Sequence, residues 1–164
     1  MRGATGVRVK IRDAKPEDAE AACAVLRASI SELCAADHGN DPVLMERWLA
    51  NKQPEIVAGW IARADSSLLV AVDDDGAILA VGSVTDAGEI TLNYVSPHAR
   101  FRGASRALLA GLETRAAERG NTECRLHSTE TAHRFYLANG YADDGEPIRK
   151  HGMNSGYPMW KRLR

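Results

Sequence analysis

Three arginines surround a glycine in the second half of the chain: Arg100, Arg102 and Arg106 all lie within three residues of Gly103. The pattern of apolar residues predicts that a strand ends before this cluster and that a helix begins at the glycine. Backbone N–H groups at a helix start carry partial positive charge and bind anions, and guanidinium groups match phosphate oxygens. A glycine allows the backbone to approach a bulky group closely. The segment therefore predicts a site for a phosphorylated ligand, although a turn glycine among solvated arginines would give the same pattern.

The spacing of the glycines narrows the class of ligand. The segment has neither the GxGxxG pattern of dinucleotide-binding folds nor the GxxxxGK[ST] pattern of nucleotide hydrolases. NAD and ATP are therefore not the expected ligands.

The composition is that of a single globular domain covering residues 1–164, with 45% hydrophobic and 26% charged residues. A formal net charge of −1 gives no global reason to expect nucleic-acid or membrane binding. No apolar stretch approaches the roughly 20 residues that span a bilayer, and residues 1–10 lack the apolar core of a secretory signal. The cysteines, Cys23, Cys34 and Cys124, have no metal-binding spacing, so we expect no metal, buried thiols and a reducing cytoplasm.

The periodicity of apolar residues predicts a mixed α/β order. Predicted strands cover residues 7–11, 67–72, 77–85, 90–95, 123–127 and 157–163, and predicted helices cover 16–33, 43–50, 54–64, 104–119 and 129–139. The turn at 73–76 predicts a hairpin, and the polar composition of 37–42 predicts a loop.

Two segments resemble signatures of the GNAT superfamily of N-acetyltransferases. VSPHARFRGASRALL is similar to the acetyl-CoA-binding signature, in which a strand ends in valine and Arg/Gln-x-x-Gly-x-Gly/Ala opens a helix; the pattern falls on Arg100, Gly103 and Ser105. TETAHRFYLANGY resembles the second signature, Asn-x-x-Ala-x-x-Phe-Tyr followed by Gly-Phe or Gly-Tyr. The chain departs from the family at Ser105, where glycine or alanine is usual, and at Thr129, where asparagine is common. Ser105 keeps its backbone N–H, and Thr129 can still cap a helix.

The resemblance implies a central, mostly antiparallel twisted sheet that is flanked by helices and splayed at the cofactor-binding strands. It also implies acetyl-CoA as the acyl donor, a small-molecule or peptide amine as the acceptor, direct attack in a ternary complex, and possible homodimerisation. The implied cofactor-binding residues are Val95, Arg100, Arg102, Gly103, Ala104, Ser105, Arg106 and Thr129. The backbone of Val95 would pair with the pantetheine arm, and its N–H could face the thioester carbonyl.

The transfer needs a neutral amine, although a free alkyl amine has a pKa of about 10.4, and it needs a proton for the departing thiolate. Tyr136 matches the family tyrosine near the cofactor sulfur, which makes it the expected general acid; a core aromatic beside Phe135 is the alternative. Asn93 stands where the family usually has an apolar residue. Its amide could hold a water, the oxyanion or the acceptor, or it could be a satisfied buried polar group.

The residues leave the general base open. Four candidates are Asp37, His38, Asp41 and Glu89, of which the first three would act through water; the alternative for each is a solvated surface residue. His98 and His127 are expected to be structural or exposed. The acidic character of the 37–41 segment favours a cationic amine acceptor by charge complementarity.

Two functions of other classes remain open. The first is a non-catalytic acyl-CoA-binding sensor or scaffold, against which the presence of Tyr136 argues. The second is a toxin-type acetyltransferase of aminoacyl-tRNA, which needs a basic face for RNA. The net charge argues against that face, unless five C-terminal basic residues cluster in space: Arg134, Lys150, Lys161, Arg162 and Arg164.

Overall fold

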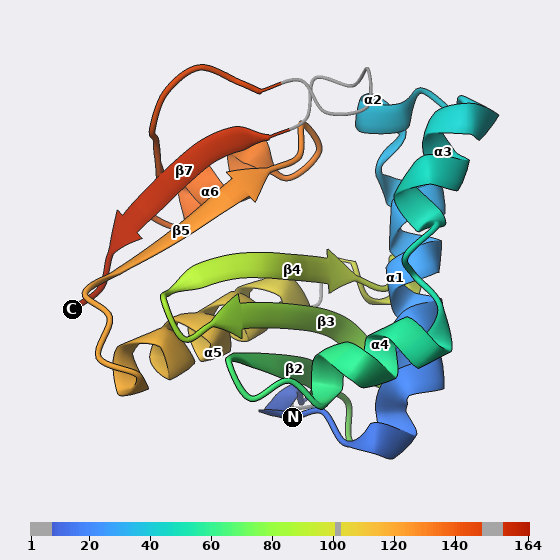
Figure 1. Cartoon of the computed structure of the whole chain (residues 1–164), viewed down its shortest axis with the longest axis horizontal. Helices are drawn as coiled ribbons and strands as arrows, with labels where there is room; N and C mark the ends of the chain where they lie inside the picture. Colours follow the sequence, from blue (N-terminus) through green and yellow to red (C-terminus); the bar gives the residue numbers. More distant parts are fainter. Residues whose placement is uncertain (1–7, 101–102, 149–155) are drawn as a thin grey trace, which may run out of the picture.

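A seven-stranded sheet runs through the computed structural model, which describes residues 8–100, 103–148 and 156–164 (Figure 1). The strand order is β1-β2-β3-β4-β5-β7-β6. The strands are β1 (Lys10–Asp13), β2 (Ser66–Val72), β3 (Ile78–Thr85), β4 (Glu89–Val95), β5 (Glu123–Ser128), β6 (Ala142–Asp143) and β7 (Tyr157–Arg162).

The sheet is antiparallel at every neighbouring pair except β4 and β5, which run parallel. Their pairing covers only Glu89 with Arg125 and Ile90 with Leu126. Beyond these residues the two strands diverge, and a wedge opens between them (Figure 1). The predicted fold class, a mostly antiparallel sheet flanked by helices and splayed between two central strands, is confirmed.

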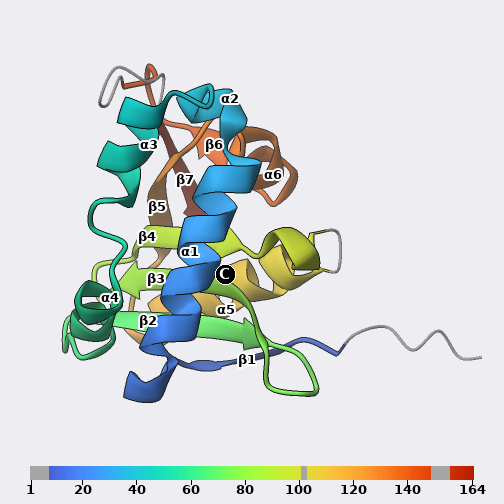
Figure 2. The same ribbon diagram turned by 90° about the vertical axis from the view of Figure 1, so that its right-hand side faces the viewer.

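Helices cover both faces of the sheet. The longer ones are α1 (Ala19–Leu33), α3 (Pro42–Leu49), α4 (Pro54–Ile61), α5 (Ala104–Glu118) and α6 (His133–Ala138), and the short ones are α2 (Ala35–His38), η1 (Pro16–Asp18) and η2 (Pro97–Ala99). Helix α1 crosses one face of the sheet, and α5 lies behind the other (Figure 2). Each face has its own apolar core, one centred on Leu26 of α1 and the other on Leu108 and Leu112 of α5. No helix in the described part of the chain is long and apolar enough to cross a membrane.

A bulge in β4 decides which face of the sheet its apolar side chains cover. Ser83 of β3 pairs with Leu92 and Val84 pairs with Ile90, which leaves Thr91 as the extra residue. Because side chains alternate along a strand, one extra residue exchanges the faces. Ile90 therefore packs with the α5 core, whereas Leu92 packs with the α1 core.

Several details differ from the predictions. The first strand covers Lys10–Asp13 and not residues 7–11. The predicted loop at 37–42 is partly helical, because Ala35–His38 forms α2. The helix predicted over 129–139 begins only at His133, because a turn occupies the preceding residues. The two-residue strand β6 is too short to show a period in the sequence.

Candidate active site

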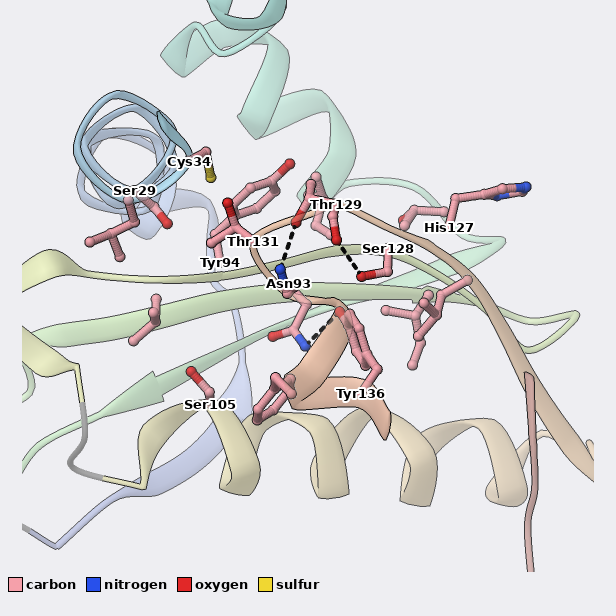
Figure 3. A pocket seen from close by; sticks show the side chains of 18 of the residues that line it. Ser29, Cys34, Asn93, Tyr94, Ser105, His127, Ser128, Thr129, Thr131 and Tyr136 are labelled. Atoms are coloured by element: carbon pink, nitrogen blue, oxygen red, sulfur yellow. Dashed lines mark hydrogen bonds between the residues drawn. The ribbon is translucent and has the colours of Figure 1, made fainter. Parts of the chain in front are cut away.

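A cavity of about 230 Å³ lies in the wedge between β4 and β5 (Figure 3). We call it the β4–β5 cavity. Its lining comes from the C-terminal end of α1, from β4, from the ends of β5 and α6 and from the start of α5. The lining residues are Ser29, Leu33, Cys34, Ile90, Thr91, Leu92, Asn93, Tyr94, Val95, Arg100, Ser105, Leu126, His127, Ser128, Thr129, Thr131, Ala132, Phe135 and Tyr136.

The open edge of β4 presents backbone groups to this cavity. The N–H of Ser96 donates to the carbonyl oxygen of Leu79 on β3 at 2.7 Å. Because successive residues of an antiparallel strand direct their amide groups to opposite edges, the backbone groups of Val95 and Asn93 face the wedge. The early separation of β5 leaves this stretch of β4 available to an extended ligand.

The start of α5 forms a second wall. Gly103 is the N-cap residue and has a φ of 79°, a left-handed conformation that favours glycine. A Cβ at this position would meet no atom within 4 Å, so the space in front of the helix is open. The first helical hydrogen bond runs from Ala107 N–H to the carbonyl oxygen of Gly103 at 3.0 Å. The three N–H groups before Ala107 therefore have no acceptor within α5.

The predicted anion-binding side chains differ in their placement. Ala104 is buried and anchors the helix start in the α5 core. Ser105 and Arg100 line the cavity, and Arg106 is exposed on the first turn of α5. Arg102 lies outside the described residues.

Tyr136 lies buried on α6 and meets Asn93 of β4 inside the cavity. The Asn93 Nδ2 donates to the Tyr136 Oη at 3.0 Å (Figure 3). The ring of Tyr136 packs edge-on against Phe135 and Tyr141, with centroids 5.3 and 5.4 Å away. Burial raises the pKa of Tyr136 to about 12, and the Asn93 bond partly opposes that rise. The phenol is therefore protonated at neutral pH, and its own proton is not used in the bond to Asn93.

The sequence-family model of the acetyltransferase (GNAT) domain matches residues 32–163, which is most of the chain. The chain belongs to the GNAT acetyltransferase family. A GCN5-related N-acetyltransferase from Rhodopseudomonas palustris has a similar structure, with a TM-score of 0.83 and 24% identity over 98% of this chain and 100% of that one. The PaiA N-acetyltransferase from Thermoplasma acidophilum, solved in complex with coenzyme A, has a TM-score of 0.79 and 21% identity over 95% and 99% of the two chains. No protein of curated function matches the sequence.

A partly buried ion pair lies behind the catalytic candidate of this GNAT enzyme. The Tyr141 Oη donates to the Glu113 Oε2 at 2.8 Å, and the Lys161 Nζ donates to the Glu113 Oε1 at 3.0 Å. Glu113 of α5 thereby binds both Lys161 of β7 and Tyr141, whose ring contacts Tyr136. Lys161, one of the five basic residues considered for an RNA-binding face, has this structural partner.

Thr129 keeps part of the role expected at its position in the GNAT signature. It lines the cavity, and its Oγ1 accepts the N–H of Ala132 at 3.1 Å. The hydroxyl therefore closes the turn that leads into α6, and the N-cap residue of α6 itself is Ala132.

The prediction that Asp37 could be a solvated loop residue is wrong. Asp37 is 8% exposed in α2, and its carboxylate accepts from Glu130 N–H at 2.7 Å, from Thr131 N–H at 3.2 Å and from the Thr131 Oγ1 at 2.6 Å. It thus ties α2 to the turn before α6. The sequence does not reveal this contact, because the partners lie more than ninety residues further along the chain.

His38 is also buried, at 1% exposure, and has a structural role. Its Nε2 lies 2.7 Å from the carbonyl oxygen of Ile30, and its Nδ1 accepts the N–H of Asn40 at 3.0 Å. These partners select the neutral imidazole with its proton on Nε2. Asp41 caps α3 by accepting the N–H of Val43 at 2.8 Å.

None of the described residues that line the cavity is an aspartate or a glutamate. Glu89 is exposed at the start of β4 and lies outside the lining. His127 belongs to the lining, but its imidazole points away from the cavity (Figure 3). The structure therefore brings Asn93 and Tyr136 together and leaves all four candidate bases outside. In the described part of the chain, no cluster of three or more His, Cys, Asp or Glu residues could hold a metal ion.

Replacing Asp37 with alanine is expected to lower the free energy of unfolding by about 3 kcal/mol, because three donors near the cavity lose a charged acceptor. Urea unfolding measures the change. Thr131→Val removes one of the three bonds and should cost less. Equal stability of Asp37→Ala and the wild type would contradict the assignment.

Ser29 was not among the residues predicted for the site. It lies on the buried face of α1, three residues after Leu26 and one before Ile30, and it lines the cavity. The signal that could have indicated Ser29 is a serine within the stripe of buried apolar residues of α1.

Proposed function

We propose that this GNAT acetyltransferase transfers the acetyl group of acetyl-CoA to a primary amine by direct attack in a ternary complex. The observation that carries the proposal is the pairing of Asn93 with a buried, protonated Tyr136 inside the β4–β5 cavity. The phenol supplies a proton at one wall, and the start of α5 supplies an anion site beside it.

The residues present fit acetyl-CoA. The N–H groups of Ala104, Ser105 and Arg106 would hold the pyrophosphate, because they have no acceptor within α5 and the space before Gly103 is open. Arg100 and Arg106 would contribute positive charge, as would Arg102. The backbone of Val95 would pair with the amide groups of the pantetheine arm.

Three residues of the chain would then act on the reaction. Acetyl-CoA, when bound, supplies a thioester carbonyl that a neutral amine can attack. The Val95 N–H donates to the carbonyl oxygen as negative charge develops there. Tyr136 donates its phenolic proton to the sulfur as the C–S bond breaks, and Asn93 holds the phenol in place. The proton that the amine loses after the attack would pass to water, because no carboxylate among the described residues lines the cavity, and water would return a proton to the Tyr136 phenolate.

We further propose that residues 1–164 form one catalytic domain and that it works in a reducing cytoplasm. The three cysteines are free and buried, as expected for thiols that pack as small apolar groups. Homodimerisation stays a prediction.

The proposal is tested by mixing the enzyme with acetyl-CoA and a panel of primary amines, and by measuring thiol release. Acetyl-CoA consumption that depends on the amine is expected. Tight binding of acetyl-CoA without turnover of any amine would instead indicate a sensor or scaffold. Turnover of aminoacyl-tRNA alone, with RNA binding that weakens as salt increases, would indicate the toxin-type activity.

A further inference from the structure

The hydroxyl of Ser29 projects into the β4–β5 cavity from the C-terminal half of α1 (Figure 3). Ser29 is 3% exposed, and its hydroxyl has no hydrogen-bond partner among the described residues. Buried polar groups in folded proteins are nearly always satisfied, by protein, water or ligand. A helical serine commonly bonds back to the carbonyl four residues earlier, and Ser29 does not make that bond. The hydroxyl is therefore available to a group inside the cavity.

The side chains around Ser29 in the cavity are uncharged. Cys34 lines the same end, and burial together with the nearby Asp37 carboxylate raises the pKa of its thiol to about 12. Burial likewise raises the pKa of the Tyr94 phenol, which accepts a hydrogen bond from Trp48. The thiol and the phenol are therefore both neutral at physiological pH.

Carboxylates are also missing from the lining at this end of the cavity. Asp37 is the acid that raises the pKa of Cys34, but it lies outside the lining, and its oxygens accept three hydrogen bonds from the turn before α6. No described residue lining the cavity is acidic, and residues 1–7, 101–102 and 149–155 contain no aspartate or glutamate in the sequence. A second ammonium group of an acceptor would therefore lose its hydration here without direct contact with a carboxylate.

Ser29 and Tyr136 project from different walls of the cavity, with Asn93 between them (Figure 3). An acceptor whose amine faces the Tyr136 side would direct its substituent toward α1. Three other hydroxyl groups of the lining, those of Ser128, Thr129 and Thr131, already have hydrogen-bond partners. The Ser29 hydroxyl has none among the described residues, and it can donate or accept.

On the basis of the proposed function, we propose that Ser29 determines acceptor specificity. It hydrogen-bonds an uncharged polar group, such as a hydroxyl or an amide, on the substituent of the primary amine. The site thus selects amino alcohols and amino amides over alkyl amines and over diamines. The acidic composition of 37–41 favours a cationic acceptor instead, and diamines therefore represent that alternative in the test.

The test uses four sets of primary amines matched in chain length, which end in a hydroxyl, an amide, a methyl or a second ammonium group. For the wild type we expect kcat/KM with the hydroxyl or amide set to exceed that with the methyl set by about tenfold, with the diamines lowest. Ser29→Ala should make the hydroxyl and methyl sets equal. Ser67→Ala is the matched control, because Ser67 is buried but lies outside the cavity lining.

An unchanged preference in Ser29→Ala, or diamines as the best acceptors, would overturn the assignment of Ser29 while leaving the acetyltransfer proposal intact. Failure of every amine to react would contradict the proposed function instead. In that case the role of Ser29 is tested by calorimetric titration of the same amines into the enzyme–coenzyme A complex. Tighter binding of amino alcohols to the wild type than to Ser29→Ala would support the assignment of Ser29, and equal binding would refute it.

Discussion

Gly103→Glu is expected to abolish detectable binding of acetyl-CoA, whereas the wild type is expected to bind it with micromolar affinity. The new carboxylate would project into the open space before α5 and would compete with the pyrophosphate for the same N–H groups. It would also place a negative charge beside Arg100 and Arg106. Isothermal titration calorimetry measures both affinities.

Gly120→Glu provides a matched control at the other end of the same helix. Gly120 also has a positive φ, of 89°, and a Cβ there would also meet no atom within 4 Å. The two substitutions therefore impose similar backbone strain and add the same charge, but only the one at Gly103 faces the proposed phosphate site. Wild-type affinity in Gly103→Glu, or equal loss of affinity in both variants, would remove the start of α5 from the binding site.

Tyr136→Phe is expected to lower kcat by about a hundredfold and to leave the acetyl-CoA dissociation constant nearly unchanged. The phenylalanine keeps the ring contacts with Phe135 and Tyr141 but cannot donate a proton to the departing sulfur. Steady-state kinetics with calorimetry separates the two effects. A fall in acetyl-CoA affinity with unchanged kcat would identify Tyr136 as a packing residue only.

Tyr141→Phe is the control for loss of a phenol, because Tyr141 lies outside the cavity lining and donates to Glu113. This change should reduce stability more than kcat.

The pH profile gives a further check on the role of Tyr136. With a pKa of about 12, Tyr136 stays protonated as pH rises from 7 to 10, so the wild-type rate should not fall in that range through loss of the acid. A decline in kcat with a midpoint near pH 8 would contradict the assignment.

The regular elements were largely predictable from the sequence, because the periods of their apolar residues reflect local burial. The hairpin at 73–76 and the strand-to-helix passage ending at Gly103 follow from turn chemistry and local spacing. The bulge at Thr91 has no such signal, since it depends on how β3 and β4 pair.

The parts of the site that escaped prediction are contacts between distant segments. The hydrogen bond from Asn93 to Tyr136 joins residues 43 apart, on β4 and α6, which only the fold brings together. Asp37 was read from the polar composition around it, but its environment is set by the turn before α6. The family signatures indicated which helices and strands form the site. The burial of each side chain and its hydrogen-bond partners can be known only from the folded structure.

The fate of an isotope-labelled acetyl group tests the central claim most directly. Acetyl-CoA that is labelled in its acetyl group is incubated with the enzyme and an amine that the enzyme acetylates. Mass spectrometry then follows the label in the amine, the protein and free acetate. We expect label in the amine with the wild type, far less with Tyr136→Phe, and none on the protein in either the presence or the absence of amine. Label on the protein before amine is added, or label recovered only as acetate, would contradict direct transfer in the β4–β5 cavity.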